Sequence, residues 1–205
     1  MLDFAALRTL LLARRFAVAR MPLPPPAAPR TLTHTRRVRF EGYRRTDGLW
    51  DLEAHLEDVK PQDYLLSSGM RAAGVPIHDM WIRLTVDRQY NVIAACAAID
   101  AMPYTGHCNE ITPDYGNLAG LNLMHGFRKA LKERFGGVHG CSHLTEALSH
   151  FPTVALQTFA GEVRDNEDRG HKPFQLDRCH ALDTHGEAVR RYYPKWHKAA
   201  RTVTK

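Results

Sequence analysis

Residues 31–60 have the sequence TLTHTRRVRFEGYRRTDGLWDLEAHLEDVK, in which apolar and polar side chains alternate on both sides of a turn signal. The positions on one face are Val38, Phe40 and Gly42 before the turn and Trp50, Leu52 and Ala54 after it. A period of two residues is typical of a half-buried strand, and Asp47-Gly48 is a preferred hairpin turn. The stretch therefore predicts an antiparallel β-hairpin.

The rest of the body predicts a second hairpin and then helices. Residues 77–87 and 91–103 have strand-like content, and a turn-rich connection at 64–76 precedes them. From residue 116 the apolar spacing changes to three and four, which predicts one helix ending at Gly136-Gly137 and another over 144–159, bent at Pro152. Strands followed by helices indicate an α+β fold, with a small antiparallel sheet of two hairpins packed against two main helices.

The two ends differ from the body in composition. We expect residues 1–33 to be an N-terminal extension, first basic and then Pro-rich, residues 34–196 to be a single domain, and residues 197–205 to be a basic tail. Residues 1–20 fit an amphipathic targeting helix, but the preferred interpretation is that translation starts at Met21. Arginines interrupt this segment too often for a membrane span, so we expect no membrane association.

Charge and cysteine content narrow the functional class. The net charge is +6, but residues 1–30 carry +4 and residues 190–205 carry +6, which leaves −4 on residues 31–189. A nucleic-acid-binding fold carries its basic patch on the folded body, so we expect no nucleic-acid partner. The four cysteines form no CxxC pair, and no convincing secretory signal is present. We therefore interpret them as reduced thiols of a cytoplasmic protein.

The segment GGVHGCSHLTEAL, residues 136–148, is the first candidate for a functional site. It places Cys141 and His143 at the start of a predicted helix, where three glycines permit a tight turn and Ser142 is the expected N-cap. A thiol at a helix start has a lowered pKa and more thiolate, the form that attacks carbon or binds metal. The alternative is that Cys141 is merely buried and His143 merely polar.

Further candidate ligands come from distant segments. His78 starts the strand 77–87, where it shares a face with Met80, while Cys96 stands among apolar residues and is assigned to the core. The candidate metal ligands are His78, Cys108, Cys141, His143 and Cys179. Ligands from separate segments are typical of catalytic metal sites rather than of zinc fingers. Cys–His nucleophile sites are built from separate segments in the same way.

Several of these motifs resemble the bacterial domain-of-unknown-function family 2889 (DUF2889). The motifs are RTDGLWD at 45–51, IHDMWIRLTVD at 77–87, MPYTGHC at 102–108, LAGLNLMHGF at 118–127, GGVHGCSHLTEAL at 136–148 and CHAL at 179–182. The resemblance covers about residues 34–196 and implies a single domain. It draws attention to the same His and Cys residues without implying a role for any of them.

Three functions are compatible with this sequence. The preferred hypothesis is a small-molecule enzyme, a hydrolase or lyase, built on a divalent metal (zinc or iron) or on a Cys–His catalytic pair. Cys141 would then be a catalytic thiol, Glu146 a general base, and Arg44 or Arg45 the clamp for an anionic substrate. The alternatives are a metal or iron–sulfur carrier protein and a structural module without a site. A homo-oligomer is compatible with each, and the absence of nucleotide-binding motifs argues against nucleotide chemistry.

Overall fold

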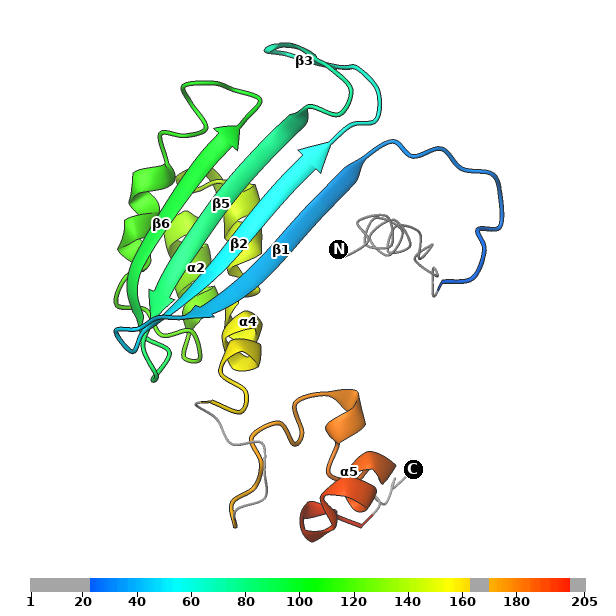
Figure 1. Cartoon of the computed structure of the whole chain (residues 1–205), viewed down its shortest axis with the longest axis vertical. Coiled ribbons are helices and arrows are strands. Elements are labelled where there is room, and N and C mark those ends of the chain that lie inside the picture. The colour runs from blue at the N-terminus through cyan, green and yellow to red at the C-terminus, as the bar shows by residue number, and fades with distance from the viewer. Residues whose placement is uncertain (1–22, 163–169, 200–205) are drawn as a thin grey trace, which may run out of the picture. The chain divides into compact units, whose positions relative to one another are not determined.

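A computed structural model of the chain describes residues 23–162 and 170–199 (Figure 1). The chain divides into a unit Met1–Leu32 and a unit Thr33–Lys205. Of the first unit, residues 23–32 are described, and they contain no helix or strand. The interpretations of residues 1–20 and of the start at Met21 lie outside the described residues.

Four antiparallel strands form the main sheet, in the order β1-β2-β5-β6. They are β1 (Thr35–Arg44), β2 (Trp50–Val59), β5 (Pro76–Val86) and β6 (Val92–Ala101). The β1–β2 turn contains Gly48 with a φ of 85°, a left-handed conformation that glycine adopts without steric cost. Both predicted hairpins, and the α+β class, are confirmed.

Helices cover one face of this sheet, which we call the inner face (Figure 1). Its core is apolar because alternate residues of each strand point to the same side; in β2 these are Trp50, Leu52, Ala54 and Leu56, all buried. The opposite, outer face carries cross-strand ion pairs such as Arg83 with Glu53. The alternation predicted for β2 is therefore confirmed.

The first predicted helix is shorter than its apolar spacing suggests. The elements over the inner face are η1 (Thr112–Leu118), α2 (Phe127–Phe135), η2 (Gly137–His139), α3 (Ser142–Leu148) and α4 (Phe151–Thr158). Residues 119–126, predicted to be helical, form turns and short bridges. Gly120 and Gly126 have φ angles of 83° and 70°, a left-handed backbone that cannot continue a right-handed helix. The apolar period in this region reflects burial rather than helix.

The second predicted helix is two helices, α3 and α4, instead of one bent helix. Ser149 and His150 separate them, and Pro152 lies in the first turn of α4. Proline has no backbone N–H and therefore cannot bond to the carbonyl of Leu148 one turn earlier. The chain accordingly starts a new helix, with proline in the position that helices tolerate best.

The connection at 64–76 is rich in turns, as expected, and also contains a two-stranded sheet, β3 (Tyr64–Leu66) with β4 (Gly69–Arg71). One smaller expectation is wrong. Cys96 is exposed instead of lying in the core. It pairs in register with Arg83 of β5, whose side chain is on the outer face, whereas the neighbouring Ala95 and Ala97 pack against the core. An apolar run alone does not tell which alternate residues point inward.

Residues 170–199 contain η3 (His180–Leu182), α5 (Glu187–Tyr192) and η4 (Pro194–Trp196). Asp177 organises this segment, because it accepts hydrogen bonds from the backbone N–H and the hydroxyl of Thr184 and pairs with Lys172 at 2.7 Å.

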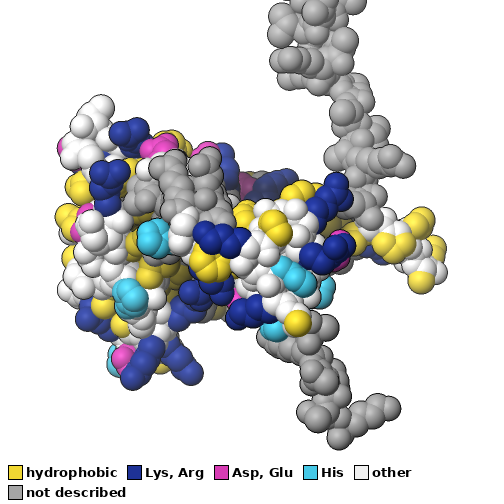
Figure 2. Space-filling model, turned by 90° about the horizontal axis from the view of Figure 1, so that it is seen from below, with side chains coloured by type: hydrophobic (Ala, Val, Ile, Leu, Met, Phe, Trp, Pro, Cys, Tyr) yellow, Lys and Arg dark blue, Asp and Glu magenta, His cyan; other side chains and the backbone are white. Residues whose placement is uncertain are grey.

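On the face in Figure 2, Lys and Arg side chains form several groups with apolar side chains between them. Among the described residues, no helix combines the length and apolarity that crossing a bilayer requires.

Candidate functional site

Three polar side chains form a row across the inner face at one end of the sheet. The strand register places Arg36 of β1 opposite Asp58 of β2, and Asp58 opposite His78 of β5. Each lies two residues beyond the last apolar position of its strand, so the alternation that buries the core also turns these side chains inward. Helix α3 packs against β2 and β5 and brings His143 over the row.

Asp58 is the centre of the site and is only 2% exposed. Arg36 donates from Nε to Oδ1 at 2.9 Å and from Nη2 to Oδ2 at 2.8 Å, while Nε2 of His34 lies 3.0 Å from Oδ1. Burial on its own would raise the pKa of Asp58, but the hydrogen bonds and charge of Arg36, followed by those of His78, lower it below its ordinary value. Asp58 is therefore ionised at neutral pH.

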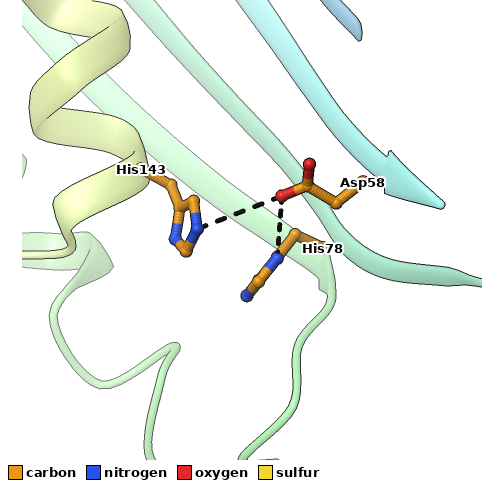
Figure 3. A group of neighbouring side chains, drawn as sticks. All are labelled: Asp58, His78 and His143. Carbon is orange, nitrogen blue, oxygen red and sulfur yellow. Dashed lines mark hydrogen bonds and ion pairs between the residues drawn. The ribbon is translucent and has the colours of Figure 1, made fainter. Parts of the chain in front are cut away.

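Two imidazoles face the same carboxylate oxygen (Figure 3). His78 Nδ1 lies 3.0 Å from Asp58 Oδ2, and His143 Nε2 lies 4.0 Å from it, with ring centroids 4.0 Å apart. Burial lowers the pKa of both rings. For His78, the hydrogen bond to Asp58 raises the pKa again, but only in part. For His143, the charges of His78 and Arg36 lower the pKa further. Both rings are consequently neutral at pH 7, and each keeps one nitrogen lone pair.

Cys141 joins the site through His143. Its Sγ lies 3.8 Å from His143 Nδ1 and 3.9 Å from the sulfur of Met80. Cys141 itself is the N-cap residue of α3, so the expected N-cap, Ser142, is instead the first helical residue. A Cβ on Gly140 would lie 2.5 Å from the carbonyl oxygen of Phe135, so only glycine fits the tight turn before the thiol.

Tyr115 holds the backbone of Cys141 in place. Its side chain is fully buried; the N–H of Cys141 donates to Tyr115 Oη at 2.9 Å, and the phenol lies 3.3 Å from the carbonyl oxygen of Cys141. Burial raises the pKa of this phenol, despite its hydrogen bonds with Thr145 and Cys141. The phenol thus remains protonated and serves as both donor and acceptor.

Tyr115→Phe is expected to lower the free energy of unfolding by about 1–3 kcal/mol, because it leaves the N–H of Cys141 buried without its acceptor. Urea denaturation followed by circular dichroism measures this change. Tyr104→Phe is the matched control, since Tyr104 is exposed and should tolerate the same loss of a hydroxyl. Equal stability of the two variants would contradict the structural role of Tyr115.

The structure brings together three of the five proposed metal ligands: His78, Cys141 and His143. Glu146 lies one turn along α3 and reaches the rim, 3.3 Å from Arg36 Nη1. In the described part of the chain, the group whose ligand atoms all lie within 4.8 Å of one another consists of Asp58, His78 and His143. Cys108 and Cys179 do not belong to that group.

Arg44 and Arg45, the expected substrate clamp, lie at the other end of the strands. Arg44 is eight residues from Arg36 along β1, or about 26 Å at the usual strand rise. Arg44 pairs with Glu162 at 3.6 Å, and Arg45 pairs with Asp47 at 2.6 Å. The structure therefore does not bring these arginines to the site around Asp58.

The sequence interpretation missed Asp58 and Arg36, although the pattern contains a signal for both. Asp58 continues the series Trp50, Leu52, Ala54 and Leu56, and all four of these residues are buried and apolar. A charged residue at a position that the alternation assigns to the core is the informative exception, because buried charges require partners. Arg36 occupies the equivalent position in β1 and supplies that partner.

Comparison with known proteins identifies one family. A family model described as "Protein of unknown function (DUF2889)" matches residues 34–157, which include every residue of the site around Asp58. The match ends before CHAL at 179–182 and therefore before Cys179. No curated protein and no solved structure is significantly similar to the chain. The model covers more than half of the chain, and this protein therefore belongs to the DUF2889 family.

Proposed function

We propose that Asp58, His78 and His143 bind one divalent metal ion, and that this centre serves a hydrolase or lyase acting on a small molecule. The observation that carries the proposal is the convergence of two imidazoles and one buried carboxylate, with ligand atoms within 4.8 Å of one another. In a tetrahedral site, two ligand atoms about 2.1 Å from the ion lie about 3.4 Å apart. His78 Nδ1 lies 3.0 Å from Asp58 Oδ2 in a hydrogen bond, so an ion bound between these two atoms would replace the imidazole proton.

The donor set suits zinc or iron. Imidazole binds both metals, and two imidazoles with one carboxylate are a common ligand set for each of them. Metal binding requires neutral imidazoles, and the lowered pKa values of His78 and His143 supply them. Three protein ligands leave a position for substrate or water, where a bound ion would polarise an oxygen or acidify water. This open position favours an enzyme over a carrier.

Arg36 limits how Asp58 can serve as a ligand. Its fork occupies both carboxylate oxygens, so the ion would use the remaining lone pair of Oδ2, on the side that faces His78. The positive charge of Arg36 opposes the cation, whereas its two hydrogen bonds fix the orientation of the carboxylate. We therefore expect an ion that exchanges more readily than one in a closed structural site.

A Cys–His nucleophile is the second candidate, because His143 has Cys141 Sγ at 3.8 Å on one side and Asp58 Oδ2 at 4.0 Å on the other. This order of thiol, imidazole and carboxylate is that of nucleophilic hydrolases. The lowered pKa of His143 makes it a weak base toward the thiol, which favours the metal. If Cys141 is a nucleophile, a thiol probe should modify Cys141 faster than the more exposed Cys96 in metal-free protein.

The metal proposal predicts about one ion per chain in protein purified without chelators and without oxygen. His78→Ala and His143→Ala should each lose most of this metal, since each removes one of three ligands. His55→Ala is the matched control: His55 lies on the outer face, bonded to Asp79 at 2.7 Å, and its removal should leave the metal content unchanged. Elemental analysis measures the outcome, and wild-type protein without metal would contradict the proposal.

A further inference from the structure

Arg36 has two hydrogen-bonding edges, and only one of them is committed to the core of the site. The edge formed by Nε and Nη2 holds the carboxylate of Asp58 at 2.9 and 2.8 Å. The outer group, Nη1, makes a single longer contact of 3.3 Å with Glu146 Oε2. The Arg36 side chain is 36% exposed, so this outer edge faces the surface beside the cluster of Asp58, His78 and His143.

Glu146 is a weak occupant of that edge. Its side chain is 65% exposed, and exposed ion pairs of this kind contribute little to stability. Among the described residues, Arg36 is the contact that holds the Glu146 carboxylate. Another carboxylate can therefore replace it at little cost. Glu146 nevertheless shows which chemical group the outer edge accepts.

We propose that Arg36 anchors the substrate, and that the substrate is a small organic carboxylate that displaces Glu146. A planar guanidinium edge matches a planar carboxylate through two parallel hydrogen bonds, which distinguishes it from the point charge of lysine. The same guanidinium bonds to Asp58 Oδ2, which lies 3.0 Å from His78. A carboxylate that replaces Glu146 would bind the same guanidinium as Asp58 and would therefore lie at the edge of the cluster.

This assignment changes two roles expected from the sequence. Arg36 takes the place of Arg44 and Arg45 as the anion-binding arginine, and Glu146 becomes a competitor for the substrate position rather than a general base. The identification of the bound carboxylate as substrate rests on the proposed function, whereas anion binding at Arg36 does not. The two ideas can therefore be tested separately.

The test titrates propionate into metal-free protein and follows the Arg36 Nε–H signal by NMR, with chloride at equal ionic strength as the blank. Glu146→Gln should tighten propionate binding by about two- to five-fold, because it removes the competing charge. Arg36→Lys should weaken binding by about ten-fold or more, because the fork is lost; the amide signals of neighbouring residues report on this variant. Arg37→Gln is the matched control, since Arg37 points to the outer face and pairs with Glu57.

The proposal is overturned if Glu146→Gln leaves the affinity for propionate unchanged, or if Arg37→Gln weakens binding as much as Arg36→Lys does. Inorganic phosphate is the comparison ligand, because a guanidinium fork also matches phosphate. Tighter binding of phosphate than of propionate would overturn the carboxylate assignment, which rests on Glu146 as the present occupant. If Arg36→Lys does not fold, Glu146→Gln decides the matter alone, because its side chain is exposed. A protein that contains no metal as purified but binds propionate as expected would contradict only the metal site. A protein that contains metal as purified but lacks the Glu146→Gln effect would contradict only the anion site.

Discussion

Asp58→Ala is expected to lower the free energy of unfolding by about 3 kcal/mol, the lower end of the range for breaking a buried ion pair. Asp58 is buried and accepts from Arg36 at 2.9 and 2.8 Å, and its removal leaves His78 without its partner as well. The loss stays at the lower end because Arg36 and His34 are partly exposed and can turn toward water. Urea denaturation at pH 7 measures the change.

Glu57→Ala is the matched control for Asp58→Ala. Glu57 is the preceding residue of β2, but its side chain points to the outer face, where it pairs with Arg37 at 2.8 Å. An ion pair at the surface contributes about 0–1 kcal/mol, so the two neighbouring acids should differ clearly in effect. Similar losses for both variants would show that Asp58 is not the buried centre of the row.

Phe159→Ala should cost about 3–5 kcal/mol in the free energy of unfolding. Phe159 has no exposed surface, and its ring lies 4.8 Å from that of Trp50 and 4.7 Å from that of Tyr90. Truncation leaves a cavity that the two neighbouring rings cannot close. Trp50 is eight residues from Asp58 along β2, or about 26 Å. At temperatures well below its unfolding midpoint, the variant should therefore keep the wild-type metal content.

Phe159→Leu provides the comparison, because leucine keeps most of the buried apolar volume and should cost less than half as much. Thermal melting gives the stability of both variants, and elemental analysis gives their metal content. A folded Phe159→Ala protein that has lost its metal would show that the site depends on packing at the far end of the sheet. The row around Asp58 would then not be an independent local unit.

The sheet was predictable because its signals are local. A two-residue alternation defines which side chains share a face, and Asp47-Gly48 specifies the turn between β1 and β2. The helices were predictable in kind but not in extent. Positive φ angles at Gly120 and Gly126 and the missing N–H of Pro152 divide the apolar runs, and an apolar period contains neither fact.

The candidate site shows the same limit. The sequence by itself identified His78, Cys141 and His143, because their residue types are suited to the chemistry and because glycines precede the thiol. Only the tertiary structure decided that Asp58 and Arg36 belong with them, that Glu146 lies at the rim, and that Arg44 and Arg45 lie at the opposite end. Strand register and helix packing determine these positions, because they set which distant residues become neighbours. A sequence pattern indicates which face of the sheet a residue occupies, but not which residue lies opposite it on the next strand.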